Sequence, residues 1–230
     1  MAAGNALVKV ADVMLAKGKK VAANLLEASE ADIQYRNGNF EVVGTDRRVT
    51  LFETARRARE MGENLDTKDK ADTPLTFPNG VHIAEVEIDP DTGHLDVVTY
   101  TAVDDCGNML NPMVVEGQMH GSLANGFGQA LLEDLVYDKA GGQLLSGSFM
   151  DYAMPRAHDM PVEFREAAMP VPAKSNPLGV KGTGEAGTTA AIAALMNAVS
   201  HAVPNGAADH MDMPATPAKI WQACQKGMAK

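Results

Sequence analysis

Cysteine is scarce in this sequence, and its scarcity restricts the class of protein. Only Cys106 and Cys224 occur among 230 residues, and two cysteines so far apart do not form the disulfide framework of a small secreted domain. A reducing, cytoplasmic compartment is therefore expected. No apolar run reaches the roughly 20 residues that a membrane-spanning helix requires. The first residues also lack the order of a signal peptide, because their basic cluster follows the apolar part.

Positive charge is scarce as well. The chain has 20 Lys and Arg residues against 30 Asp and Glu residues, which gives a formal net charge of −10. Such a chain repels the phosphates of nucleic acids and anionic lipids, so neither a nucleic acid nor a membrane is an expected partner. Aromatic residues make up only 5%, but 45% of the residues are hydrophobic and 14 are Met. That composition can form an adaptable core in one large domain or two small ones.

The first 75 residues combine helical and strand patterns. Asn37-Gly38 is typical of a tight hairpin turn, and Thr50 and Glu53 have the spacing of a capping box. The predicted elements are a helix over 6–28, strands over 33–35 and 40–43, and a helix over 51–61. The apolar face of the first helix is expected to contain Leu7, Val10, Met14, Val21 and Leu25.

A polar stretch over residues 62–74 separates this segment from the rest, so the chain is expected to consist of two parts, 1–75 and 76–230. In the second part, alternating residues flank a turn at 89–93 and predict a second hairpin. The predicted elements are strands over 81–88, 95–103 and 162–167, and helices over 111–135, 190–203 and 218–228. This pattern indicates an α+β fold, in which mixed short sheets pack against helices.

Glycine recurs at helical spacing in the predicted helix over 111–135. A smooth stripe is formed by Gly117, Gly121, Ala124 and Gly128, and a polar stripe beside it by Gln118, Ser122, Asn125 and Gln129. Each glycine costs a helix roughly 1 kcal/mol relative to alanine, so the close approach of another group must compensate. Either another backbone packs on the smooth stripe or a ligand lies there, and periodicity alone favours packing.

A second glycine-rich stretch, residues 174–189, surrounds one carboxylate. Gly179, Gly182, Gly184 and Gly187 flank Glu185, and a helical pattern follows. Glycine-rich loops that enter a helix can hold an anion, because free amides and the helix dipole converge there. An unrelated phosphate-binding protein is one interpretation. A carboxylate in such a loop is either a participant in chemistry or an acidic residue in the first turn, which the dipole favours.

Several motifs occur together, in an order and spacing that resemble a known family. They are Val103-Asp-Asp-Cys-Gly107, Asn111-Pro, Val115-Glu-Gly-Gln118, Gly126-Phe-Gly-Gln-Ala-Leu131, Gly147-Ser-Phe-Met-Asp-Tyr-Ala-Met-Pro155, Gly179-Val-Lys-Gly-Thr-Gly-Glu185 and Asp212-Met-Pro-Ala-Thr-Pro217. The chain resembles the C-terminal part of the molybdenum-binding large subunit of the xanthine dehydrogenase/aldehyde oxidase family. Its branch is similar to the large chain of aerobic carbon monoxide dehydrogenase.

This resemblance implies a molybdenum-dependent oxidoreductase that hydroxylates an aldehyde, an N-heterocycle or a similar electron-poor carbon of a small-molecule substrate, using water. The family's catalytic glutamate falls on Glu185, as general base, and a glutamine that binds the pterin falls on Gln118. Gly182 and Gly184 would let the loop approach the cofactor. No residue of this chain is expected to ligate the metal. The resemblance makes ligand binding, rather than packing, the favoured role of the glycine helix.

The resemblance also implies a cofactor and partner chains. The expected cofactor is molybdopterin cytosine dinucleotide, with iron–sulfur clusters and FAD on partner chains. Subunits of this family are much longer than this chain, so the remaining portion of the molybdenum-binding subunit is an expected partner, and the surface facing it should be apolar and Met-rich. The alternative is a non-catalytic, orphan or truncated C-terminal domain that acts only as a structural or interaction module.

Overall fold

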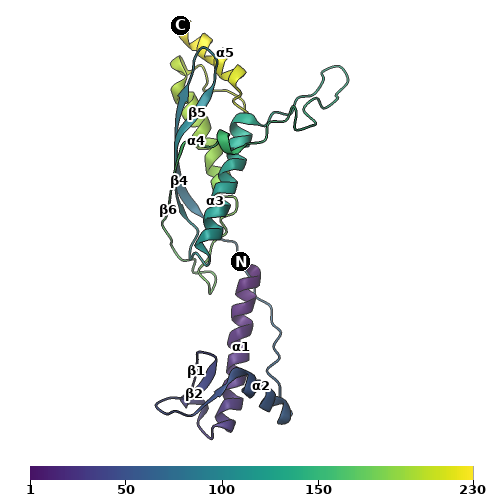
Figure 1. Cartoon of the computed structure of the whole chain (residues 1–230), viewed down its shortest axis with the longest axis vertical. Coiled ribbons are helices and arrows are strands. Elements are labelled where there is room, and N and C mark those ends of the chain that lie inside the picture. The colour runs from purple at the N-terminus through teal and green to yellow at the C-terminus, as the bar shows by residue number, and fades with distance from the viewer. Residues whose placement is uncertain (230) are drawn as a thin grey trace. The chain divides into compact units, whose positions relative to one another are not determined.

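The computed structural model describes residues 1–229, which fall into two compact units (Figure 1). Unit 1 comprises Met1–Leu75 and Lys174–Leu178, and unit 2 comprises Thr76–Ala173 and Gly179–Lys230. The short segment Lys174–Leu178 belongs to unit 1 because the side chain of Leu178 lies beside Gly4. Within residues 1–229, no helix is both long and apolar enough to cross a membrane.

Unit 1 places one long helix against a small antiparallel sheet. Its elements are α1 (Ala2–Leu25), a 3-10 turn (Glu30–Asp32), β1 (Ile33–Arg36), β2 (Asn39–Val42), β3 (Arg48–Thr50) and α2 (Leu51–Glu60). The predicted hairpin is confirmed, and Asn37 and Gly38 both have positive φ, 49° and 80°, as a tight two-residue turn requires. Half of the predicted capping box is present, since the Thr50 hydroxyl accepts a hydrogen bond from the Glu53 amide at 3.1 Å, but the Glu53 carboxylate pairs with Arg56 on the next turn and not with the Thr50 amide.

The predicted apolar face of α1 is wrong at its first position. Leu7 is 69% exposed, and the buried apolar residues of α1 are Val21, Ala22 and Ala23, near its C-terminal end. Ala22 and Ala23 pack there against the hairpin side chains Ile33 and Phe40, and Val21 packs against Ala58 of α2 and Leu65. The Phe40 ring lies directly over Gly18, so a larger residue at that position would collide with it. Strand β3 was not predicted, because it has only three residues and exists by pairing with β2.

Unit 2 packs helices on one face of a three-stranded mixed sheet. Its elements are β4 (Asn79–Ile88), β5 (Leu95–Asp105), α3 (Pro112–Phe127) with a π-helical continuation (Gly128–Leu132), a 3-10 turn (Ala157–Asp159), β6 (Glu163–Ala168), α4 (Ala186–Ala202), a 3-10 turn (Pro204–Gly206) and α5 (Pro217–Met228). The sheet order is β4-β5-β6, in which β4 and β5 are antiparallel and β6 is parallel to β5. The expected α+β architecture is therefore confirmed.

The core of unit 2 lies between this sheet and helices α3, α4 and α5. Its largest fully buried side chains are Tyr100, Phe127, Met119, Leu195, Ile220 and Val199. Val81 and Ile83 on β4 are 65% and 56% exposed, whereas Val86 on the same strand packs against the core. The alternation along β4 is unbroken, so residues 81 and 83 lie on the opposite face of the strand from residue 86. The register shifts where Glu85 pairs with Thr99 and Val86 with Val97, and this bulge places its extra residue in β5.

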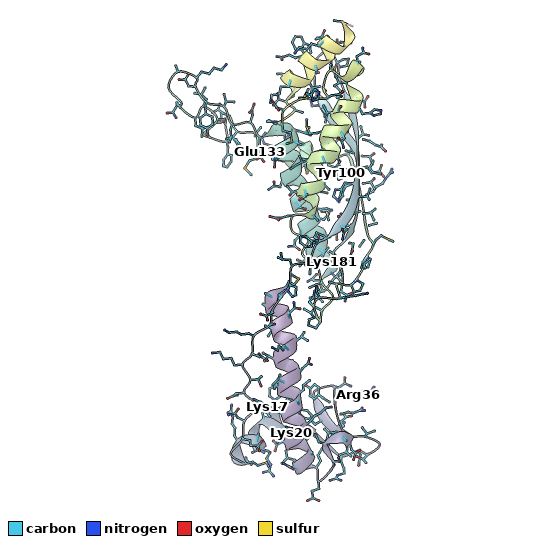
Figure 2. The ribbon with its side chains drawn as sticks, turned by 180° about the vertical axis from the view of Figure 1, so that it is seen from behind. Lys17, Lys20, Arg36, Tyr100, Glu133 and Lys181 are labelled. Carbon is cyan, nitrogen blue, oxygen red and sulfur yellow. The ribbon has the colours of Figure 1, made fainter. Side chains whose placement is uncertain are left out.

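A long loop, residues 133–155, leaves the core of unit 2 after the π-helical turn; we call it the arm (Figure 1). Near its start, Tyr137 and Leu144 form a single antiparallel β-bridge. At its base the Tyr152 hydroxyl donates a hydrogen bond to the Glu133 carboxylate at 2.5 Å (Figure 2). The large apolar side chains exposed on the arm are Leu135, Val136, Tyr137, Leu145, Phe149, Met150 and Met154.

Candidate functional site

The structure brings three of the four residues singled out by sequence close together. Glu185 is the N-cap residue of α4 and Gln118 lies in the first half of α3. A Cβ built on Gly184 would lie 3.6 Å from Nε2 of Gln118. The loop that carries Glu185 therefore lies directly beside the polar stripe of α3. Gly182 lies on the other side of this loop, in a separate hollow.

Two hollows in unit 2 meet at Glu185. The first, which we call the polar groove, has a volume of about 600 Å³ and is lined by Gln118, Gly121, Ser122, Asn125, Gly184, Glu185, Thr188 and Thr189. The second, which we call the acidic hollow, has about 610 Å³ and is lined by Thr76, Phe77, Pro78, Asn79, Gly80, Asp104, Gly182, Gly184, Glu185, Ala186, Thr189 and Ala190. Glu185 lines both, so its carboxylate is reachable from either side.

The glycines of α3 and of the loop before α4 form two groups: in one the fold leaves no room for a side chain, and in the other it leaves open space. A Cβ on Gly126 would lie 2.7 Å from Cβ of Ala191, and a Cβ on Gly187 would overlap the Ser122 hydroxyl, so these glycines permit the close crossing of α3 and α4. By contrast, a Cβ on Gly117, Gly121 or Gly182 would meet no heavy atom within 4 Å. The three also lack positive φ, so neither packing nor backbone conformation within the described chain requires glycine there.

This division corrects the smooth stripe predicted for α3. Ser122 and Gly126, which lie outside that stripe, contact α4, whereas Gly117 and Gly121 of the stripe face open space. Gly128 belongs to neither group, because a Cβ there would collide with the Glu133 carboxylate at the base of the arm. The packing surface and the open glycine surface therefore lie on two different faces of one helix, which periodicity alone could not separate.

Two amide side chains of the polar groove have no partner within the described chain. Gln118 and Asn125 are exposed, and residues 1–229 offer no hydrogen bond to either side chain. Ser122, by contrast, serves the fold: its carbonyl accepts a hydrogen bond from the Thr188 hydroxyl at 2.7 Å, and its own hydroxyl donates to the Met119 carbonyl at 3.0 Å. The groove thus presents free donors and acceptors from Gln118 and Asn125 beside an open glycine surface.

The loop that carries Glu185 is fastened to the end of β5. The Lys181 ammonium donates a hydrogen bond to Asp105, and both side chains are only 12% exposed (Figure 2). The amides of Gly107 and Val171 also donate to Asp105, at 2.9 and 2.8 Å. Burial opposes ionisation of this carboxyl, but the hydrogen bonds and the Lys181 charge outweigh it, so the pKa of Asp105 lies below its usual value.

Sequence reasoning missed a polar chain that supports the floor of the acidic hollow. His82 was given no role, yet its side chain is 1% exposed and links Tyr100 to Asp104, with both distances 2.9 Å. Because a carboxylate only accepts, Nε2 donates to Asp104 and Nδ1 accepts from the Tyr100 hydroxyl. Burial, together with the Asp104 charge, raises the pKa of Tyr100. The only available signal was that 82 and 104 lie on the same face of adjacent strands.

Charge further defines both hollows. Their lining residues include the carboxylates of Glu185 and Asp104 but neither Lys nor Arg. An anionic group would therefore meet no side-chain cation there, and only main-chain amides and the α4 N-terminus could favour it. Neutral polar groups and cations are the natural occupants of these surfaces.

Known proteins resemble this chain over most of its length. Residues 1–161 match the sequence pattern of the molybdopterin cofactor-binding domain. The chain is 33% identical to the 6-hydroxypseudooxynicotine dehydrogenase complex subunit gamma of Paenarthrobacter nicotinovorans, over 97% of this chain and 29% of that protein. It is 32% identical to the carbon monoxide dehydrogenase large chain of Hydrogenophaga pseudoflava, over 97% of this chain and 28% of that protein.

Two solved structures are also similar to this chain. The crystal structure of a Cu,Mo carbon monoxide dehydrogenase superposes with a TM-score of 0.86 at 30% identity, over 97% of this chain and 29% of that chain. Quinoline 2-oxidoreductase from Pseudomonas putida 86 superposes with a TM-score of 0.79 at 34% identity, over 94% of this chain and 29% of that chain. The chain thus spans less than a third of the length of these relatives.

Proposed function

This chain belongs to the molybdopterin cofactor-binding domain family, and from that premise we propose that it forms one part of a molybdenum hydroxylase. In this proposal it supplies the general base Glu185 and one wall of the pterin site, including Gln118, Gly182 and Gly184. The reaction is the hydroxylation of an aldehyde, an N-heterocycle or a similar electron-poor carbon, with water as the source of oxygen. The named relatives act on carbon monoxide, quinoline and nicotine derivatives, which serve as probe substrates.

One observation carries the proposal: Glu185 lies where two hollows meet, on a surface whose glycines the chain itself does not require. Gly121 in the polar groove and Gly182 in the acidic hollow leave open space where any other residue would place a side chain. Gln118 and Asn125 present free amides to the polar groove. A flat heterocycle with donors and acceptors along its edge fits such a surface, because it needs close approach and amide partners.

The lining of the two hollows suits the pterin of the cofactor but not the phosphates of a dinucleotide. Neither hollow is lined by Lys or Arg, so the pyrophosphate would have no charged partner on these surfaces. We therefore assign the pterin edge to this chain and the phosphates to chain outside residues 1–229. The cytosine dinucleotide is the form we propose, since the proposed enzyme resembles bacterial members of the family.

Glu185 is suited to accept a proton. Its side chain is exposed to both hollows, and within residues 1–229 it makes no ion pair or hydrogen bond that would occupy the carboxylate. A general base must be free to reach the proton that it removes. The bound cofactor would supply the redox chemistry, accepting two electrons as the substrate carbon is oxidised. The role of Glu185 is to take the proton released from water during that oxidation.

The proposed enzyme requires further chains. We propose that the remaining portion of the molybdenum-binding subunit covers the exposed apolar residues of unit 2. Some of the largest of these outside the arm are Phe77, Val81, Ile83, Met113, Val162 and Met169. Surfaces with so many exposed apolar side chains mark protein interfaces. Iron–sulfur and FAD subunits would then carry the electrons away.

The test begins with a tagged chain purified from its host together with its partners. Molybdenum and pterin are then quantified per chain, and we expect about one of each, the content of a loaded site. Absence of both from a preparation that retains its partners would contradict the proposal and favour a structural or interaction module. Nucleotide binding by the chain alone, with no pterin, would favour the phosphate-binding interpretation.

Glu185→Gln then tests the base. The amide keeps the shape of the side chain but cannot accept the proton, so turnover of the probe substrates should fall by at least ~100-fold, while molybdenum and pterin stay bound. The matched control is Glu87→Gln, an exposed carboxylate on β4 that lines neither hollow. Turnover by Glu185→Gln equal to that of the control would remove Glu185 from the mechanism.

A further inference from the structure

Glu185 is positioned by its main chain alone. Since its carboxylate has no partner in residues 1–229, no side-chain contact fixes where it points. Gly182 and Gly184 precede it in the loop, and glycine allows more backbone conformations than any other residue. A loop of this composition needs fixed points on either side of Glu185 if the carboxylate is to occupy one place.

The fixed point after Glu185 lies in the first turn of α4. There the Thr188 hydroxyl donates to the Ser122 carbonyl on α3 at 2.7 Å. Gly187 lets the two helices approach closely enough for this bond, because any Cβ at that position would overlap Ser122. The start of α4 is thus fastened to the wall of the polar groove that contains Gln118.

The fixed point before Glu185 is the ion pair between Lys181 and Asp105. Asp105 accepts from the Val171 amide and the Lys181 side chain, which lie 66 and 76 residues further along the chain, and from the nearby Gly107 amide. The main chain around Lys181 is also bonded to the segment that follows β5. The Lys181 amide donates to the Cys106 carbonyl at 2.8 Å, and the Asn108 amide donates to the Gly179 carbonyl at 2.9 Å. The loop is therefore held against the end of β5 four residues before Glu185.

We propose that Lys181 and Asp105 are positioning residues for Glu185, and that their ion pair selects the one loop conformation in which the carboxylate faces both hollows. The inference rests on the proposed function, because it concerns the same carboxylate. It assigns a role to two residues that lie outside the lining of either hollow. They act through the main chain and do not touch the substrate or the cofactor.

We expect the ion pair between Lys181 and Asp105 to specify one conformation of the loop more than it stabilises the fold. Removing two charges from water is costly, and a buried ion pair is often no more stabilising than well-packed apolar residues of similar size. A directional pair, however, is satisfied in one arrangement only. Because Oδ1 of Asp105 accepts both backbone amides and Oδ2 accepts Lys181, the position of Lys181 is tied to the main chain of two other segments.

Because the two oxygens of Asp105 have different partners, one substitution can remove the bond to Lys181 alone. In Asp105→Asn the remaining oxygen can still accept from Gly107 and Val171, so only the bond to Lys181 is lost. Asp105→Asn combined with Lys181→Met removes both charges, leaves no unpaired buried cation, and preserves side-chain length at residue 181. Lys181→Arg keeps the charge and serves as the conservative variant. Arg165→Met breaks an exposed pair with Glu163 on β6 and is the matched control.

The first measurement is amide hydrogen exchange on the full chain without cofactor. In the double variant we expect exchange of the Lys181 and Gly182 amides to rise by at least about tenfold, while Leu195 and Val199 in the core of α4 change less than about twofold. Lys181→Arg and Arg165→Met should leave the loop within about twofold of the wild type. An unchanged loop would overturn the inference, as would an equal rise in the core, which would report general destabilisation.

The second measurement uses the assembled, cofactor-loaded enzyme. Displacement of a base lowers kcat more than it raises KM, so the double variant should lose at least about tenfold in kcat with KM within about twofold. Lys181→Arg should restore most of the rate. Unchanged kcat in a double variant whose loop exchanges faster would overturn the positioning role. Should Glu185→Gln keep full turnover, the proposed function fails, and the exchange result still decides whether the pair orders the loop.

Discussion

The two groups of glycines predict opposite effects of the same substitution. Gly121→Ala adds a methyl group where no heavy atom lies within 4 Å. Gly187→Ala adds one that would overlap the Ser122 hydroxyl and lie 3.0 Å from the Leu123 nitrogen and 3.1 Å from the Met119 oxygen. In both cases alanine is the better helix former. The surroundings therefore decide the sign of the change in stability.

The magnitudes follow from these contacts. Replacing glycine by alanine in a helix interior contributes about 1 kcal/mol, and nothing opposes this gain at Gly121, so unit 2 should become more stable by about 0.5–1 kcal/mol. At Gly187 the new methyl group meets backbone atoms of α3, which cannot move independently of their helix. Overpacking of this kind costs about 1–3 kcal/mol, which exceeds the gain. Gly187→Ala should therefore be destabilised by about 1–2 kcal/mol.

Urea unfolding followed by tryptophan fluorescence measures both changes. Trp221 is the only tryptophan in the chain and lies on α5 in unit 2, so its signal reports that unit alone. A change of 1 kcal/mol moves the urea midpoint by roughly 0.3–1 M, upward for Gly121→Ala and downward for Gly187→Ala. Gly121→Ala should also retain less pterin in the assembled enzyme, because the methyl group enters the polar groove. A lower midpoint for Gly121→Ala would refute the division of glycines.

Two further predictions concern buried titratable groups. The pKa of Asp105 is lowered in the fold, so its contribution to the free energy of unfolding is complete above the unfolded pKa of about 3.9 and is lost as the pH falls through the lower folded pKa. The urea midpoint of the wild type should therefore drop more steeply below pH ~4 than that of the Asp105→Asn, Lys181→Met double variant. Parallel curves for the two proteins would contradict this. His82→Leu leaves Tyr100 and Asp104 without their shared partner and should lower the free energy of unfolding, measured in urea, by about 2–4 kcal/mol. In the control His94→Leu, the replaced side chain is 66% exposed, so the loss should be less than about 0.5 kcal/mol. Equal losses of stability in the two variants would refute a structural role for the Tyr100–His82–Asp104 hydrogen bonds.

Much of the local structure could be predicted because its cause is local. The turn residues Asn37-Gly38 determine a hairpin through their backbone preferences, and the Thr50 cap is set by its own hydroxyl. Pro217 begins α5 for the same reason, since proline suits the first turn of a helix. On α5, Ile220 and Cys224 are buried, but Trp221 is 42% exposed.

What could not be predicted depends on contacts between distant segments. The exposure of Leu7 follows from where the hairpin and α2 pack on α1. The same holds at the candidate site. The motifs identified Glu185 and Gln118, but their proximity arises from the crossing of α3 and α4. The roles of Glu185, Gln118, Gly182 and Gly184 remain predictions, as do the cofactor form and the partner chains.

The arm has a consequence for handling and monitoring the protein. Met150 is 92% exposed and Phe149 beside it 76%, on a segment whose two ends are joined at its base by the hydrogen bond between Tyr152 and Glu133. A thioether so open to solvent is readily converted to the sulfoxide, which is polar and disrupts apolar contacts. Mild peroxide would therefore oxidise Met150 rapidly in the free chain and slowly wherever another surface covers the arm. The sulfur atom is a built-in chemical reporter of assembly, and its oxidation is a route by which assembly would be lost.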